Sequence, residues 1–187
     1  MKLSKNLFIM GFIVTLGNTF CGTNSFAAPE NVKNVAVTSD EMNILADIAV
    51  IDKTEIILAA VASNKKVSTG VMDFAKFLID HHGSNLTQVL EIAHNLHFTS
   101  LNSNQANKLT TEGNEAMMKL GSLQGKQFDT AYIDAMVKGH QGALDLIDTQ
   151  LMKKAKTESI KSFLINTRAA VAQHLEMAKK IQQNLQP

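Results

Sequence analysis

The sequence contains few residues that interrupt helices and only one that can form a covalent cross-link. Proline occurs only at positions 29 and 187, tryptophan is absent, and the single cysteine is Cys21. Because proline disrupts helix interiors, its absence between these two positions favours long, uninterrupted helices. One cysteine can form neither an internal disulfide nor a thiolate cluster for a metal ion. The sequence therefore excludes a disulfide-stabilised scaffold and a cysteine-ligated zinc site.

The charged residues give no sign of a nucleic-acid partner. The chain has 18 basic and 17 acidic side chains and a formal net charge of +1. Proteins that bind nucleic acids concentrate lysine and arginine on one face, and the sequence has no block of basic residues. It also lacks a glycine-rich phosphate loop and a serine nucleophile motif. We therefore expect no nucleic-acid partner, and no catalytic motif identifies an enzyme.

The first 27 residues have the features of a secretory signal peptide. Lys2 and Lys5 precede an apolar run over residues 7–16, and Ser25 and Ala27 are the small residues that signal peptidase reads. We expect cleavage after Ala27, which removes the cysteine and two lysines and leaves 16 basic and 17 acidic side chains. The apolar run is too short to span a membrane. The mature chain is thus expected in the periplasm or outside the cell, without a membrane span.

The rest of the chain is predicted to be one helical domain. Residues 28–37 are expected to form a flexible leader, and residues 38–187 the domain. Apolar residues recur there at intervals of three and four, which is the period of an amphipathic helix. The intervals predict long helices over about residues 40–66, 69–96, 127–153 and 157–185, and a shorter helix over about 105–123. The fold class is therefore all-α: a four-helix bundle with an additional short helix between the second and third long helices.

Each long helix carries one residue with a metal-ligand side chain in its apolar stripe. These residues are Glu55, His82, His140 and His174. Counted from the turns that join the helices, Glu55 matches His82 in height, and His140 matches His174 to within about one turn. Three neutral imidazoles and a carboxylate suit Zn(II), Cu(II), Fe(II) or Mn(II). We therefore predict at most one transition-metal ion at the middle of the bundle, or an unusual pair that uses flanking acids such as Asp80.

The adjacent residues His81 and His82 are expected to play different roles. Neighbours on an α-helix point about 100° apart, so both cannot face one ion from a regular helix. His82 is in register with the core positions Leu78 and Val89, whereas His81 lies on the flank of that stripe. We expect His82 to face inward, and His81 to lie on the surface or beside a ligand.

Other interpretations of the four residues stay open. In a metal-free network, Glu55 would accept a hydrogen bond from a buried histidine and fix the register of the helices. A two-metal ferritin site is not matched, since it needs a glutamate three residues before a histidine, and none of the three histidines has one. Gly83, Gly139 and Gly142 provide either tight helix packing, which we favour, or a path to the site. A redox enzyme is the least favoured interpretation because only these glycines point to such a path.

Several segments resemble the exported bacterial family called domain of unknown function 4142. The most specific is the run Phe128-Asp129-Thr130-Ala131-Tyr132 that continues through Met136-Val137 to His140, and the likeness covers about residues 40–181. The resemblance implies a ferritin-like four-helix bundle, similar in its histidines to exported metal-handling bundles. Where the family usually has aspartate before its histidines, this chain has His81 and Gly139, so a carboxylate that orients the ring is not expected from those positions.

Together, these observations favour an exported bundle that binds a transition metal and serves metal handling or envelope stress tolerance. The alternative is a metal-free structural or interaction module whose buried histidines and glutamate form an architectural network. The sequence leaves open which metal binds, and whether the third long helix runs parallel or antiparallel to the second.

Overall fold

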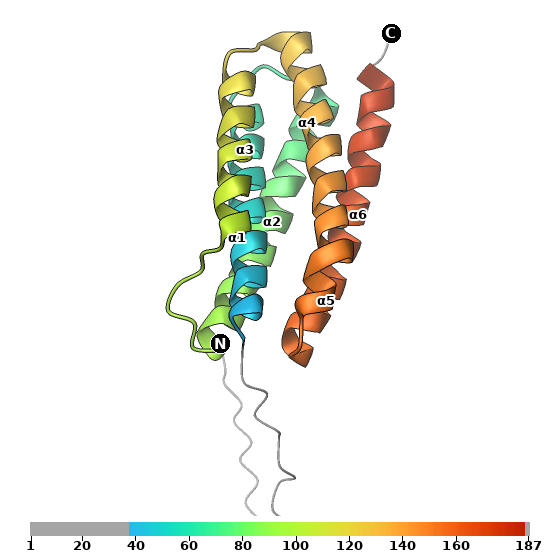
Figure 1. Ribbon diagram of the computed structural model, residues 1–187. Coiled ribbons are helices and arrows are strands. Elements are labelled where there is room, and N and C mark those ends of the chain that lie inside the picture. The colour runs from blue at the N-terminus through green and yellow to red at the C-terminus, as the bar shows by residue number, and fades with distance from the viewer. Residues whose placement is uncertain (1–37, 186–187) are drawn as a thin grey trace, which may run out of the picture. The chain divides into compact units, whose positions relative to one another are not determined.

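The computed structural model describes residues 38–185, and within this range every element is a helix. The elements are α1 (Ser39–Ser63), α2 (Thr69–Asn95), α3 (Asn104–Gly121), α4 (Gly125–Leu146), the π-helical segment η1 (Ile147–Leu151), α5 (Met152–Lys154) and α6 (Glu158–Leu185) (Figure 1). The predicted all-α bundle is confirmed. The expected signal peptide and leader lie outside the described residues. No described helix is long and apolar enough to cross a membrane.

The chain forms two helical hairpins, and one connecting segment runs along the whole bundle between them. Helices α1 and α2 form one antiparallel pair, and α4 and α6 form the other (Figure 1). Between them, α3 runs beside α1 and returns the chain to the end where α2 began. As a result, α4 runs parallel to α2, which is the direction that the sequence left open. The additional short helix is therefore the crossover of the bundle.

The bundle core consists of two apolar clusters, one near each end. Each cluster takes residues from one half of every long helix: Ile48, Val89, Leu146 and Leu164 belong to the first, and Leu58, Leu78, Met136 and Ala178 belong to the second. The three predicted histidines come from the positions between these halves. The core is thus divided by a polar layer at mid-height, where an apolar layer would be expected from packing alone.

Buried carboxylates hold helix ends together. Glu41, in the first turn of α1, accepts the backbone N–H groups of Lys156 at 2.9 Å and Thr157 at 2.6 Å, just before α6. Asp129 of α4 accepts the N–H of Ser68 at 2.9 Å, at the start of α2. Such N–H groups have no partner within their own helix, and an anion there also opposes the helix dipole favourably. Both carboxylates therefore stabilise the packing of one hairpin against the other.

Glu41→Gln should lower the free energy of unfolding by about 1–2 kcal/mol at pH 7, because a neutral amide accepts hydrogen bonds more weakly than a carboxylate. Burial raises the pKa of Glu41, but hydrogen bonds from Thr157, Lys156 and Thr38 outweigh it and hold the pKa below its ordinary value of 4.5. The carboxylate's contribution is therefore fully present above that value and is lost as the pH falls through the lowered pKa. Urea unfolding between pH 7 and pH 3 should show the two proteins converging.

The matched control for this experiment is Glu158→Gln, at an exposed acid in the first turn of α6. It should change the unfolding free energy by less than about 0.5 kcal/mol. Equal losses in the two variants would contradict the role given to Glu41.

Candidate metal centre

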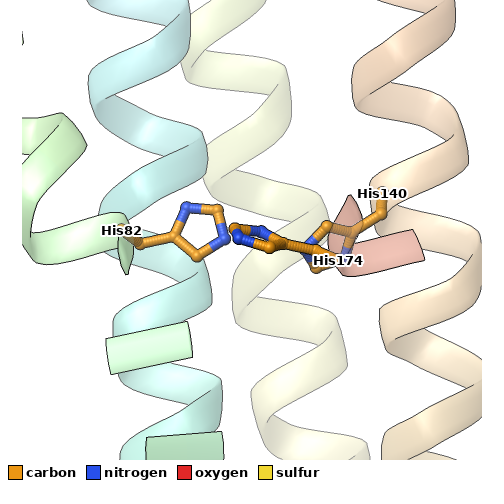
Figure 2. Close-up of side chains that lie close together, drawn as sticks. All are labelled: His82, His140 and His174. Carbon is orange, nitrogen blue, oxygen red and sulfur yellow. The ribbon is translucent and has the colours of Figure 1, made fainter. Parts of the chain in front are cut away.

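Three histidines from three helices meet in the polar layer. His82 of α2, His140 of α4 and His174 of α6 are all buried. Their ring centroids lie 5.0 to 5.7 Å apart, and one nitrogen from each ring lies within 4.8 Å of the other two. Figure 2 shows the rings converging at one level of the bundle. The structure thus brings together three of the four residues that the sequence singled out.

Hydrogen bonds fix the tautomers of two of these rings. His140 Nδ1 donates to the backbone carbonyl of Met136 at 2.8 Å, and His82 Nδ1 lies 2.8 Å from Asp52 Oδ1. Since a carbonyl or carboxylate oxygen only accepts, the proton of each neutral ring is on Nδ1. The lone pair is then on Nε2, and neither Nε2 has a hydrogen-bond partner among the described residues. Both free nitrogens belong to rings that point into the group.

The third ring is held by another histidine. His174 Nε2 lies 3.2 Å from His81 Nδ1, while His174 Nδ1 is buried and finds no partner in residues 38–185. With Nε2 of His174 as the donor, its Nδ1 carries the free lone pair. His81 is exposed, and its ring lies against that of Phe77, with centroids 3.9 Å apart and ring planes tilted by 37°. The expectation that His82 faces inward is confirmed, and His81 lies at the surface beside His174.

The surroundings of His174 keep its imidazole neutral. The pKa of His174 is lowered to about 3, mainly by burial and in addition by the nearby His82, His140 and His81. A neutral imidazole is the form that binds a metal ion. Three buried nitrogens that lack a hydrogen-bond partner are unfavourable by themselves, whereas bonds to one ion would satisfy all three. The electrostatics of the layer therefore suit a cation at its centre.

The spacing of the three nitrogens is close to that of a metal site. With all separations within 4.8 Å, there is always a point that lies no more than about 2.8 Å from each of the three nitrogens, which is 4.8 Å divided by the square root of three. Zinc–nitrogen bonds are about 2.0–2.1 Å long, so an inward shift of less than about 1 Å per ring completes the bonds. Three imidazoles on one ion leave a further coordination position open.

A carboxylate does contact one of the three histidines, and it comes from a different helix. Asp52 of α1, which is 1% exposed, contacts His82 and also accepts a hydrogen bond from Asn85 at 2.9 Å. Asn85 in turn accepts from Thr167 of α6 at 2.9 Å. Burial raises the pKa of Asp52, and the hydrogen bonds from His82 and Asn85 oppose that rise. This chain of contacts connects α1, α2 and α6 behind His82.

The sequence contained a signal for Asp52 that our prediction did not use. Asp52 follows Ile48 by four residues and precedes Glu55 by three, which are the intervals of the α1 core stripe. We expected no orienting carboxylate from the residues that precede the histidines. The orienting carboxylate instead comes from α1 and contacts a histidine of α2. Residues at the same height on neighbouring helices can be in contact without being close in sequence.

Glu55 is buried near this layer but is not part of the histidine group. Its side chain is 7% exposed, and its Oε2 lacks a hydrogen-bond partner within the described range. A Cβ atom added at Gly139 would lie 3.2 Å from Glu55 Oε1. Gly139 therefore makes room for the carboxylate. The expectation of tight packing is wrong for Gly83 and Gly142, since an added Cβ meets no described atom within 4 Å at either position.

Comparison with known proteins gives a family and no individual relative. The family described as "Domain of unknown function (DUF4142)" matches residues 26–181. No curated protein and no solved structure matches the chain.

Proposed function

The chain belongs to the DUF4142 family, whose description assigns no activity, and from the chemistry of its buried layer we propose that it binds one transition-metal ion. The ligands are His82 Nε2, His140 Nε2 and His174 Nδ1. One observation carries the proposal: one ring nitrogen from each histidine lies within 4.8 Å of one ring nitrogen of the other two, and each ring has a buried nitrogen with no partner among the described residues. Each ring is also held by a hydrogen bond through its other nitrogen, as metal-binding histidines commonly are.

The donor set narrows the choice of metal. With Glu55 outside the histidine group, the three ligand atoms are all imidazole nitrogens. Imidazole suits Zn(II), Cu(II) and Fe(II), whereas Mn(II) favours carboxylate oxygen. We rank Zn(II) and Cu(II) first, and Mn(II) last unless Glu55 turns to become a fourth ligand. The fourth position would otherwise be taken by water or by a small ligand.

The proposed setting is the periplasm or the cell exterior, in metal handling or envelope stress tolerance. The support is the signal-like segment before Ala28 and the match to the family. Material for the test below is therefore best taken from an exported fraction of the natural host, where mass spectrometry should find an N-terminus at Ala28. A retained N-terminal segment would contradict export by cleavage.

Untagged protein should contain about one equivalent of metal, and the ion should stabilise it strongly. Binding at a free-ion concentration 1,000-fold above Kd adds about 4 kcal/mol to the unfolding free energy. For a domain of this size, that corresponds to a rise in Tm of about 8–16 °C. Elemental analysis, followed by chelation and titration with Zn(II), Cu(II), Fe(II) or Mn(II) during thermal unfolding, measures both quantities.

A double variant, His94→Ala with His97→Ala, is the control because it removes two exposed histidines outside the group. Its metal content and its Tm rise should equal those of the unchanged protein. Absence of stoichiometric metal, together with no rise in Tm for any of the four ions, would contradict the proposal.

The contacts of His82 favour a second candidate, a metal-free structural or interaction module. The network of Asp52, His82, Asn85 and Thr167 ties three helices together without an ion. In this case His82→Ala would destabilise the protein while the metal content, being negligible from the start, would not change. A redox enzyme stays the least favoured reading.

A further inference from the structure

A half-open groove of about 1400 Å³ runs between α1, α3 and α4. It exists because α4 turns small residues toward it: Ala131, Ala135, Gly139 and Gly142 line this wall. These positions recur at intervals of three and four, so they lie on one face of the helix. The opposite walls carry larger apolar side chains, including Ile51 and Leu58 of α1 and Leu109 of α3. The groove thus offers a long apolar surface to a ligand.

One buried charged side chain lines this groove. Glu55 is only 7% exposed, and its Oε2 has no hydrogen-bond partner in the part of the chain that the structure describes. A buried carboxylate without a partner is unfavourable, and a cationic donor is its strongest complement. The three histidines do not belong to the described lining of the groove. The carboxylate therefore points to a ligand other than the metal ion.

The exposed charges on the walls do not select a ligand by their sign. They comprise four lysines and three acids: Lys108, Lys119, Lys126, Lys138, Glu112, Glu115 and Asp134. Together with Glu55 the positive and negative side chains are equal in number. Exposed ion pairs such as Lys108 with Glu112, at 3.8 Å, contribute little. The position of the charge matters more here than the total, because only Glu55 is withdrawn from solvent.

We propose that the groove binds an amphiphilic organic cation of the alkylammonium class. The ammonium group donates to Glu55 beside Gly139, and the alkyl chain lies along the apolar walls of α1, α3 and α4. The inference stands apart from the metal proposal, since it needs neither an ion nor any of the three histidines. It also gives Glu55 a role that the histidine group does not use.

Calorimetric titration with decylammonium, 1-decanol and decanoate, each below its micelle concentration, tests the inference on the mature chain. Decylammonium should bind with one-to-one stoichiometry and about 10- to 100-fold more tightly than decanol, the difference expected for a hydrogen bond between charged groups. Decanoate should bind most weakly. In Glu55→Gln the preference for the ammonium over the alcohol should disappear, while Glu91→Gln, at an exposed acid of α2, should keep it.

A second variant tests the groove without changing its charge. Ala135 is half-buried in the α4 wall, so Ala135→Leu should fill the groove and weaken decylammonium and decanol alike by about tenfold. Circular dichroism checks that both variants fold. Equal binding of amine and alcohol by the unchanged protein, a preference for decanoate, or an Ala135→Leu variant that binds normally would each overturn the inference.

The same variants separate this inference from the proposed metal site. If Glu55→Gln weakens zinc binding and leaves decylammonium binding unchanged, Glu55 is a metal ligand and the groove assignment is wrong. If the chain binds no metal, but Glu55→Gln removes its preference for decylammonium over decanol, the metal proposal fails and the groove assignment stands.

Discussion

His140→Leu should lower the affinity for Zn(II) by at least about 100-fold and lower the stability of the metal-free protein by no more than about 1 kcal/mol. The loss of a direct ligand should exceed the 10- to 100-fold effect that is typical of removing a group that only orients one. Leucine has a volume similar to that of histidine, so no large cavity is created. It also removes a buried nitrogen that has no partner among the described residues. Stability of the metal-free form should therefore change by no more than about 1 kcal/mol in the unfavourable direction.

His140 is the best of the three histidines for this test because its outer contact is dispensable. Its Nδ1 donates to the carbonyl of Met136, which lies one turn earlier in α4 and also receives the helical backbone hydrogen bond. No buried acceptor is left unpaired in the variant. At His82 the same substitution would leave the Asp52 carboxylate without its imidazole partner. The loss of this hydrogen bond would lower the stability of the protein, so a change in zinc binding could not be separated from a change in folding.

Two measurements decide the outcome. Competition with a chromophoric chelator gives the Zn(II) affinity, and urea unfolding in the presence of a chelator gives the stability of the metal-free protein. His94→Leu, at an exposed position near the end of α2, is the matched control and should change neither quantity appreciably. A metal-free architectural role predicts the reverse result for His140→Leu: a loss of about 1–3 kcal/mol in stability, with no zinc affinity to lose.

Asp52→Asn should lower the affinity for Zn(II) by about 10- to 100-fold, although Asp52 is not itself a ligand. The carboxylate accepts from His82 on one oxygen and from Asn85 on the other. An asparagine has only one acceptor oxygen, so its NH₂ group would face another donor on one side. Either the His82 ring or the Asn85 amide must then turn. In both cases the His82 ring is held less firmly in its orientation, and its metal-binding nitrogen becomes less basic.

Co(II) loaded at saturation distinguishes positioning from ligation. The visible spectrum of Asp52→Asn should match that of the unchanged protein, because all three imidazoles still bind, whereas His140→Leu should show an altered spectrum. Asp47→Asn is the control, since Asp47 is equally buried in α1 but bonds to Ser103 away from the histidines. If Asp47→Asn weakened zinc binding as much as Asp52→Asn, the effect would reflect general destabilisation.

The helices of this protein were predictable from sequence to within a few residues. The long stripes of apolar residues at helical intervals placed α1, α2 and α6 close to their observed bounds, and α3 was expected over 105–123 against Asn104–Gly121. The π-helical segment Ile147–Leu151 was not predicted. The apolar period around it stays close to that of an α-helix, so one widened turn leaves little trace in the sequence.

The fold class and the inward direction of His82, His140 and His174 follow from the amino-acid sequence alone. The reason is that a helix with 3.6 residues per turn fixes which side chains share a face, and the apolar residues identify the face that is buried. Tertiary structure decided what those side chains meet. Asp52 contacts His82, and the exposed His81 contacts His174. Glu55 lies apart from the histidine group and lines the groove beside α4. Contacts between helices depend on how each helix is rotated and shifted against its neighbours. The spacing of apolar residues along a single helix does not contain that information.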